Sequence, residues 1–241
     1  RLIIFLVGRL RRPCPSAGIP YRGRAANRPA FGTSLHIGFM SKSPKLISYQ
    51  VKKKNSMRKI VVSMFMALDG VVEAPNQWSF QFGSKEQQKY KYDELFACDA
   101  LLLGRETYQG FAAAWPNMPG TGDYGVRMNS IPKYVVSTTL QEAEWNNSKI
   151  IKNNISEELT TLKQQTGQDI FIFGSSTLVN SLMQYDLIDE YRLMVFPVIV
   201  GSGKRLFQDM NSKTTLKLIK TETFSSGVVV LSYQPDRSEP K

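Results

Sequence analysis

The sequence has little histidine and little cysteine, and this limits the chemistry available to most of the chain. Its one histidine is His36, so residues 57–241 contain none. Nucleophilic mechanisms that depend on a Ser–His or Cys–His pair are therefore excluded from that part of the chain. The two cysteines, Cys14 and Cys98, provide neither a disulfide framework nor a Cys/His pattern with metal-ligand spacing. We therefore expect no metal site.

Acidic residues are missing from the first 56 positions, and the excess positive charge is concentrated there. The chain has 31 Lys and Arg against 20 Asp and Glu, a formal net charge of +11. Twelve of these basic residues lie in 1–56, which leaves nineteen against twenty acidic residues in 57–241. Because residues 57–241 are close to neutral, we expect no basic groove for nucleic acid there.

Long apolar runs are also missing from residues 1–56. Residues 2–7 are apolar but too few to span a bilayer, and the Arg-, Pro- and Gly-rich segment that follows cannot bury enough apolar surface to fold. We predict a disordered basic tail. It is either an organellar targeting peptide or a non-native extension, and we favour the extension, with a cytoplasmic protein. A tether to nucleic acid or a membrane is a further alternative, but we expect neither as a partner.

From residue 57 onward, short apolar strands alternate with helical patterns. Near-continuous apolar strands are typical of a parallel sheet that is covered on both faces. A terminal period-two pattern predicts an antiparallel hairpin. We therefore predict one α/β domain over 57–241, with a mostly parallel central sheet flanked by helices and a C-terminal hairpin. The expected strands are 59–67, 99–104, 133–138, 148–152, 169–174 and 190–201, the last interrupted by Pro197. The expected helices are 83–98, which Ser84 can cap, 106–115, 156–167, with Ser156 as its cap, and 176–186. Residues 116–125 are expected to form a loop, and residues 215–235 the hairpin.

Small polar residues follow three of the predicted strands. Ligands of open α/β sheets bind beyond the carboxyl ends of the strands, so three such clusters would line one cleft. Glycine followed by hydroxyl residues at a helix start suits a pyrophosphate, and an arginine at a strand end can grip phosphate. Each cluster alone also fits an ordinary helix cap, surface arginine or loop start. The residues concerned are Gly104, Arg105, Thr107, Ser137, Thr138, Thr139, Gly174, Ser175, Ser176 and Thr177.

Five stretches, in a fixed order, carry a family resemblance that covers most of residues 57–235. They read VSMFMALDGVV (62–72), DALLLGRETYQGF (99–111), IPKYVVSTTL (131–140), DIFIFGSSTLVNSLMQYDLIDEYRL (169–193) and FPVIVGSGKRLF (196–207). In these stretches the chain resembles the dihydrofolate-reductase superfamily. The most similar branch is the one related to the reductase domain of bifunctional riboflavin-biosynthesis enzymes.

The resemblance implies NADPH as hydride donor. It places residues 104–107 and 174–177 against the phosphates and ribose of the cofactor, and residues 137–139 near the adenosine 2′-phosphate. Family members often have an arginine in the last cluster, where this chain has Ser-Thr-Thr. Selection of NADPH over NADH would therefore depend on hydroxyl groups. The resemblance also implies a homodimer that pairs through sheet edges.

The substrate side of the implied site carries fewer candidates. Asp69 is the candidate catalytic residue, either as a hydrogen-bonding or proton-relay group or, alternatively, as the carboxylate of an Asx-turn. Gly70 follows it, and Glu73, Trp78 and Phe80 lie in the next loop, where aromatic rings can stack on a flat heterocycle. Lys204 is available for a substrate phosphate or is an ordinary surface lysine.

The best named activity from the resemblance is reduction of 5-amino-6-(5-phosphoribosylamino)uracil. Reduction of a pterin or dihydrofolate is the alternative. That branch commonly directs an acidic residue of its first helix into the pocket, and Asp93 and Glu94 lie too late in the predicted helix to match. A second alternative, from another class, is an NADPH-binding module without catalysis.

Overall fold

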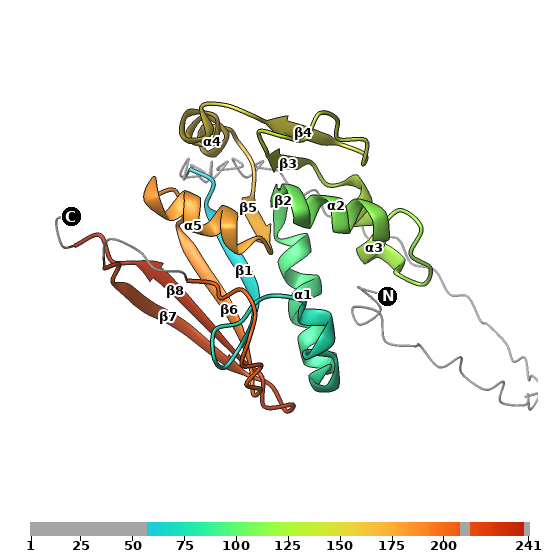
Figure 1. Ribbon diagram of the computed structural model, residues 1–241, viewed down its shortest axis with the longest axis vertical. Coiled ribbons are helices and arrows are strands. Elements are labelled where there is room, and N and C mark those ends of the chain that lie inside the picture. Colours follow the sequence, from blue (N-terminus) through green and yellow to red (C-terminus); the bar gives the residue numbers. More distant parts are fainter. Residues whose placement is uncertain (1–56, 208–212, 239–241) are drawn as a thin grey trace, which may run out of the picture. The chain divides into compact units, whose positions relative to one another are not determined.

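The computed structural model describes residues 57–207 and 213–238, which form one mixed β-sheet covered by helices (Figure 1). The predicted tail, residues 1–56, lies outside the described residues. The strands are β1 (Ile60–Ala67), β2 (Cys98–Gly104), β3 (Lys133–Val136), β4 (Ser148–Ile151), β5 (Asp169–Phe173), β6 (Glu190–Phe196), β7 (Leu216–Thr223) and β8 (Val229–Pro235). The helices are α1 (Lys85–Phe96), α2 (Arg105–Ala114), α3 (Gly122–Ser130), α4 (Ile155–Gln164) and α5 (Ser176–Gln184), with short 3-10 turns at Pro75–Gln77 and Phe80–Phe82.

The strand order in the sheet is β4-β3-β2-β5-β1-β6-β8-β7. Strands β1 to β6 pair in parallel, whereas β8 pairs antiparallel with β6 and with β7. This arrangement confirms the predicted fold class, a mostly parallel α/β sheet with a C-terminal antiparallel hairpin. Parallel pairing also brings the carboxyl ends of β1, β2, β3 and β5 to one edge of the sheet.

Both faces of the parallel strands are buried, because side chains alternate between them. On β5, Ile170 and Ile172 pack with α4 and α5, and Phe171 and Phe173 pack with α1, α2 and α3. Figure 1 shows these two groups of helices on opposite sides of the sheet. The hydrophobic effect on both faces explains why the strands have no polar side.

Helix α3 was missed by the sequence analysis, which treated the Pro- and Gly-rich residues 116–125 as a loop. The helix begins at Gly122, inside that loop. Its buried residues Tyr124 and Met128 pack in the same cluster as Leu95 and Trp115. Tertiary burial of this apolar face therefore overrides the weak local helix propensity.

Two predicted boundaries were also wrong. Strand 190–201 ends at Phe196, immediately before Pro197, because proline has no N–H to continue the ladder. The helix expected to be capped by Ser156 is instead preceded by Asn154, in the left-handed conformation, and begins at Ile155. Asparagine tolerates that conformation better than most residues.

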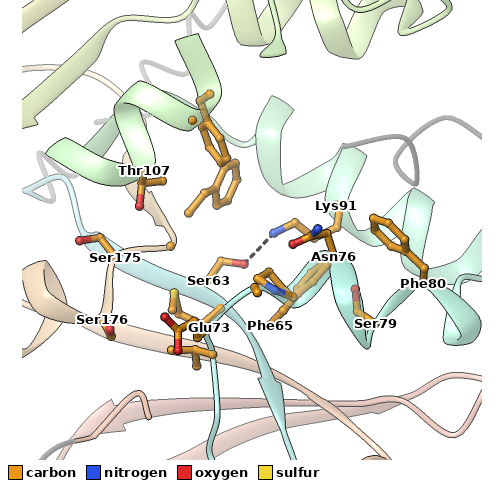
Figure 2. A pocket seen from close by; sticks show the side chains of 18 of the residues that line it. Ser63, Phe65, Glu73, Asn76, Ser79, Phe80, Lys91, Thr107, Ser175 and Ser176 are labelled. Carbon is orange, nitrogen blue, oxygen red and sulfur yellow. Dashed lines mark hydrogen bonds between the residues drawn. The ribbon is translucent and has the colours of Figure 1, made fainter. Parts of the chain in front are cut away.

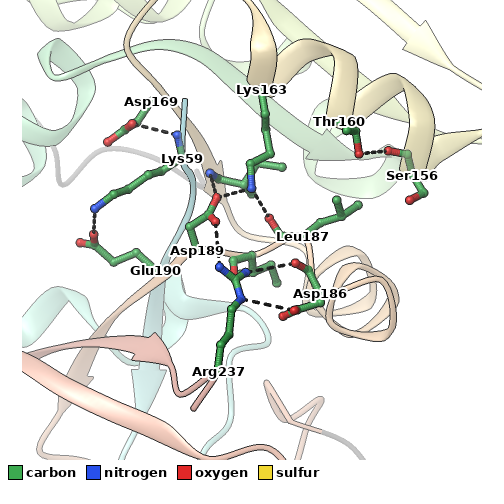
Figure 3. A network of polar contacts seen from close by, with 12 residues as sticks. Lys59, Ser156, Thr160, Lys163, Asp169, Asp186, Leu187, Asp189, Glu190 and Arg237 are labelled. Carbon is green, nitrogen blue, oxygen red and sulfur yellow. Dashed lines mark hydrogen bonds and ion pairs between the residues drawn. The ribbon is translucent and has the colours of Figure 1, made fainter. Parts of the chain in front are cut away.

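A partly buried carboxylate joins the amino-terminal end of β1 to the rest of the sheet (Figure 3). Asp189 accepts hydrogen bonds from the Ile60 amide at 2.9 Å and forms an ion pair with Lys163 Nζ of α4 at 2.6 Å. Arg237, after β8, lies 3.6 Å from the other carboxylate oxygen. The network fixes the start of β1 between β5 and β6.

Helix α1 is held against the hairpin by its first turn. The Glu86 carboxylate accepts hydrogen bonds from the Ser225 amide at 2.9 Å and the Ser225 hydroxyl at 2.5 Å. These two bonds lower the pKa of Glu86 below its usual range. At its start, the Ser84 hydroxyl caps the helix by accepting from the Gln87 amide at 3.1 Å, as the sequence predicted.

Lys133 is a buried lysine at the start of β3. Its residue is 1% exposed, and its ammonium donates to the carbonyls of Asn129, Ile131 and Asn146 at 3.2, 2.8 and 3.0 Å. It also lies 4.0 Å from the centre of the Trp145 ring. The lysine therefore satisfies carbonyls at the end of α3 and in the loop before β4.

We predict that Lys133→Met lowers the free energy of unfolding by about 3 kcal/mol, since each buried carbonyl loses a charged donor. Urea unfolding followed by circular dichroism measures this. The control is Lys149→Met on β4, whose side chain is 66% exposed and whose loss should cost less than about 0.5 kcal/mol. Equal, small changes in both variants would show that the three carbonyl contacts do not stabilise the fold.

Candidate functional site

The turns after β2 and β5 are in direct contact at the carboxyl edge of the sheet. A Cβ atom at Gly104 would overlap the Ser175 hydroxyl, and one at Gly174 would lie 3.3 Å from the Thr107 methyl group. The turn after β3 lies beside the turn after β2, because Val136 and Gly104 are register partners. The structure therefore brings all three predicted clusters to one edge, with glycine where two of them touch.

The start of α5 offers a small concave group of backbone donors. Gly174 and Ser175 both have positive φ, 100° and 67°, which for serine is a strained conformation found often at functional sites. The Ser175 hydroxyl caps the helix by accepting from the Leu178 amide at 3.3 Å. The amides of Ser176 and Thr177 lie in the first turn, where a helix has no internal acceptor for them. Such a terminus suits an anion.

A cavity of about 410 Å³ opens beside these turns, a volume typical of sites for small molecules. It is lined from β1, α1, α2, α3 and the loop that follows β1. Figure 2 shows Thr107, Ser175 and Ser176 at one end, Ser79 and Phe80 at the other, and Ser63 and Lys91 between them. Of the predicted residues, the cavity is lined by Glu73, Phe80, Thr107, Gly174, Ser175, Ser176, Thr177 and Lys204.

Aromatic side chains form much of the cavity wall. Phe65, Phe111, Trp115, Tyr124 and Phe173 all line it. Burial raises the pKa of the Tyr124 phenol above its ordinary value, so this group stays protonated at neutral pH. Rings on several sides are suited to a flat, uncharged or delocalised ligand.

The floor of the cavity carries a buried polar group that sequence analysis missed. Lys91 of α1 donates to the Ser63 hydroxyl of β1 at 2.8 Å and to Glu94 at 2.6 Å. Ser63 in turn donates to the same Glu94 oxygen at 2.8 Å. Lys91 and Ser63 line the cavity, whereas Glu94 lies behind them. The i, i+3 spacing of Lys91 and Glu94 was visible in the sequence, but such pairs usually face solvent.

The rim of the cavity is formed by two loops that are joined through Lys204. Its amide donates to the Glu73 carboxylate at 3.0 Å, and its carbonyl accepts from the Val72 amide at 2.9 Å. Its ammonium lies 3.6 Å from Glu106 at the start of α2. Lys204 is therefore positioned at the opening, next to the start of α2, and its substrate-side role stays a prediction.

Asp69 does not line the cavity, and its carboxylate has a structural task. It accepts the Gly201 amide at 2.8 Å, and this bond is the main cause of a lowered pKa. The carboxylate is therefore ionised at neutral pH and joins the turn after β1 to the loop at Gly201. The predicted catalytic role of Asp69 has no geometric support, while the alternative of a turn-forming carboxylate does.

Gly70 and Trp78 also lie outside the cavity lining. Gly70 has φ 84° and forms the tight turn after β1, where its carbonyl accepts from Leu206. Trp78 is buried in the apolar cluster beneath the hairpin, 5.5 Å from the Phe196 ring centre. Its indole donates to the Glu73 carbonyl at 2.9 Å. The expectation that Trp78 stacks on a ligand fails because burying this large ring in the core is more favourable.

The remaining predicted cofactor residues lie near the cavity but outside its lining. Gly104 contacts Ser175, as described above, and Arg105 is half-exposed, 3.5 Å from Glu106 and 3.4 Å from Gln109. The Ser137 hydroxyl accepts from the amides of Thr139 and Leu140 at 3.2 and 2.9 Å. Ser137 is thus used to form its own turn, and its hydroxyl also lies 3.5 Å from the Thr139 hydroxyl. Thr138 and Thr139 are exposed beside it.

Metal ligation, thiol reactivity and membrane crossing can be assessed for the part of the chain that the structure describes. Within it, no group of three or more His, Cys, Asp or Glu side chains could hold a metal ion. Burial raises the pKa of the Cys98 thiol to about 12, which removes it as a nucleophile at neutral pH. The helices of residues 57–207 and 213–238 include none that is long and apolar enough to cross a membrane.

Comparison with known proteins agrees with this architecture. An uncharacterized protein of Bacillus subtilis (strain 168), YyaP, is 34% identical over 182 residues, 73% of this chain and 94% of YyaP. A putative riboflavin biosynthesis protein from Shewanella sp. PV-4 has a similar structure, with a TM-score of 0.62, 20% identity, and coverage of 74% of this chain and 99% of that one.

Part of a bifunctional enzyme has a similar fold. The diaminohydroxyphosphoribosylaminopyrimidine deaminase/5-amino-6-(5-phosphoribosylamino)uracil reductase of Thermotoga maritima matches with a TM-score of 0.54 and 14% identity, over 75% of this chain and 57% of that one. The family described as "RibD C-terminal domain" matches residues 58–230. Because this family matches most of the chain, the chain belongs to the RibD C-terminal domain family.

Proposed function

We propose that this protein is an NADPH-dependent reductase of a planar nitrogen heterocycle, with activity like that of 5-amino-6-(5-phosphoribosylamino)uracil reductase. Membership in a family of RibD-like reductases supports an oxidoreductase. The observation that carries the proposal is the contact between the turns at Gly104 and Gly174. It places hydroxyls and helix-start amides on the wall of an aromatic cavity. Phosphate-binding donors next to a flat apolar site are what a nicotinamide dinucleotide requires.

The cofactor fits the residues that are present. The left-handed Gly174 leaves its backbone open to a ligand, and the amides of Ser176 and Thr177 would bind the pyrophosphate. Arg105 is half-exposed at the start of α2 and can turn from Glu106 to a phosphate. Thr138 and Thr139 would bind the adenosine 2′-phosphate. When bound, NADPH supplies the hydride.

The residues of the cavity would position the acceptor and exclude water. Aromatic rings on α2, α3 and β5 hold a flat ring by stacking. Lys204 at the rim, beside α2, is placed to bind a phosphate carried by the substrate. Tyr124 lies on the wall, and because burial raises the pKa of its phenol, this group is protonated at neutral pH. In this proposal, residues 104–107 and 174–177 form the cofactor side of the cavity, and the substrate side lies between β1 and α1.

The pterin alternative has weaker support. Among the acidic residues of α1, Asp93 is exposed and pairs with Lys89, and Glu94 is covered by Lys91 and Ser63. Neither lines the cavity, whereas a carboxylate in the cavity is what an aminopterin ring would need. The NADPH-binding module without catalysis differs from the proposed enzyme only in turnover.

We expect Arg105→Ala to weaken NADPH binding at least tenfold, about 1.4 kcal/mol, because a guanidinium–phosphate pair is lost. A fluorescence titration of the full chain measures the dissociation constant. Lys149→Ala, also an exposed cation but on β4, is the control and should bind normally. An unchanged constant for Arg105→Ala would remove this arginine from the cofactor site.

Gly174→Val should abolish NADPH binding while the far-UV spectrum remains native. Valine at φ 100° is strained, and its Cβ would be pressed against Thr107. Gly120→Val is the matched control, because Gly120 also has a positive φ, 73°, a Cβ there meets no atom within 4 Å, and the residue does not line the cavity. If the valine variant binds as the wild type does, the strand–helix junction is a packing feature only.

Turnover tests the reaction itself. We expect loss of NADPH absorbance with the phosphoribosylaminouracil at least tenfold faster than with dihydrofolate, a difference of about 1.4 kcal/mol in the barrier. Faster oxidation with dihydrofolate would favour the pterin alternative. Binding of NADPH without oxidation by either acceptor would favour the non-catalytic module.

A further inference from the structure

The indole N–H of Trp115, directly after α2, is a buried hydrogen-bond donor without an acceptor. The residue is 2% exposed and lines the cavity. Among the residues that the structure describes, no acceptor lies within hydrogen-bond distance of its Nε1. A buried donor that stays unpaired costs free energy, and a buried indole N–H usually has a partner. Trp115 therefore needs an acceptor that its own chain does not supply here.

The other two tryptophans of the chain show that the fold ordinarily supplies such an acceptor. The Trp78 indole donates to the Glu73 carbonyl at 2.9 Å, and the Trp145 indole donates to Asn129 Oδ1 at 2.8 Å. Neither of these tryptophans lines the cavity. The unpaired indole thus belongs to the tryptophan that forms part of the cavity wall.

Trp115 is held in place by both its backbone and its ring. Its amide donates to the Phe111 carbonyl at 2.9 Å, and its carbonyl accepts from the Asn129 side chain at 3.3 Å. Its ring centre lies 5.5 Å from that of Tyr124 and 6.5 Å from that of Phe111. Because close packing fixes the ring, the N–H is a preorganised donor that a ligand does not have to order.

The side chains around Trp115 decide which kind of acceptor suits it. Phe111, Tyr124 and Met128 pack in the same cluster and also line the cavity, and Tyr124 is protonated at neutral pH because burial raises the pKa of its phenol. An anionic group at this wall would lose its hydration for one neutral donor, which is costly. An uncharged acceptor loses less and satisfies the indole equally well.

We propose that Trp115 is a specificity-determining residue whose indole N–H donates to an uncharged acceptor of the ligand in the cavity, such as a carbonyl oxygen, a hydroxyl oxygen or a ring nitrogen. The wall formed by α2 and α3 then favours a ligand with an acceptor at this position over one of the same shape without it, because the second leaves the donor unpaired. The inference rests on the proposed function only for the statement that this ligand is the substrate. The hydrogen bond itself does not depend on which dinucleotide binds.

Quinoline and naphthalene are matched probes for this hydrogen bond, since they have the same shape and differ in one ring atom, the nitrogen acceptor of quinoline. Trp115→Phe removes the N–H and keeps an aromatic ring. In calorimetric titrations of the full chain, we expect this substitution to weaken quinoline about fivefold more than naphthalene, as the loss of one hydrogen bond predicts. Trp145→Phe is the matched control, because Trp145 does not line the cavity, and it should leave both affinities unchanged.

Nuclear magnetic resonance of the isotope-labelled full chain gives a second measurement, on the wild type. Each tryptophan contributes one indole N–H signal. The variants Trp78→Phe and Trp145→Phe identify two of these signals, and the remaining one belongs to Trp115. We expect the Trp115 signal to lie further downfield with quinoline than with naphthalene, while the other two respond equally to both probes. This measurement needs no change at Trp115, so it decides the matter if Trp115→Phe does not fold.

Equal weakening of the two probes by a folded Trp115→Phe variant would overturn the proposal. The same Trp115 signal with both probes, or binding of neither probe, would also overturn it. A separate NADPH titration distinguishes these failures from that of the proposed function. Absence of NADPH binding with the quinoline response of Trp115 intact rejects the cofactor site and leaves the indole hydrogen bond in place.

Discussion

Parallel pairing of β1, β2, β3 and β5 is the constraint on which the site depends. It sends the turns after these strands to one edge of the sheet, so that residues 71 positions apart in the sequence come into contact, as Gly104 and Ser175 do. Glycine at 104 is required because the Ser175 hydroxyl occupies the space of its Cβ. The hydrophobic effect on both faces of the sheet holds this edge in place.

Buried charge is a second recurring feature, and it has two different purposes. The buried Lys133 donates to three backbone carbonyls around β3. The partly buried Asp189 accepts from the Ile60 amide and pairs with Lys163, which joins β1 to α4. Lys91 is held as firmly, but one side of its environment is a cavity. The same physical device, a paired charge in a low-dielectric interior, thus fixes the fold in two places and faces a ligand site in a third.

The alternation of apolar strands and helices predicted the parallel sheet and the hairpin, and most elements lie where their patterns indicated. The turns of residues 104–107 and 174–177 were predicted correctly to meet. Both follow buried strands, and the carboxyl ends of parallel strands lie at the same edge of the sheet. Helix α3 was not predictable, since its glycines have a low helix propensity. Its apolar residues become buried only when they pack with Leu95 and Trp115, which come from other segments. Trp78 and Asp69 were predicted to face the ligand because an aromatic ring and a carboxylate are common in such sites. In the structure Trp78 packs against Phe196 in the core, and the Asp69 carboxylate accepts the Gly201 amide.

The sequence by itself determined the fold class, the family resemblance and the exclusion of Ser–His and Cys–His mechanisms from residues 57–241, which contain no histidine. These follow from composition and short-range pattern, which act within a few residues. The tertiary structure alone decided which polar side chains face the cavity. Ser63 and Lys91 are 28 positions apart and lie in segments that read as an apolar strand and a charged helix. Their meeting depends on how α1 packs across β1, and that is set by the burial of the whole core, not by any local signal.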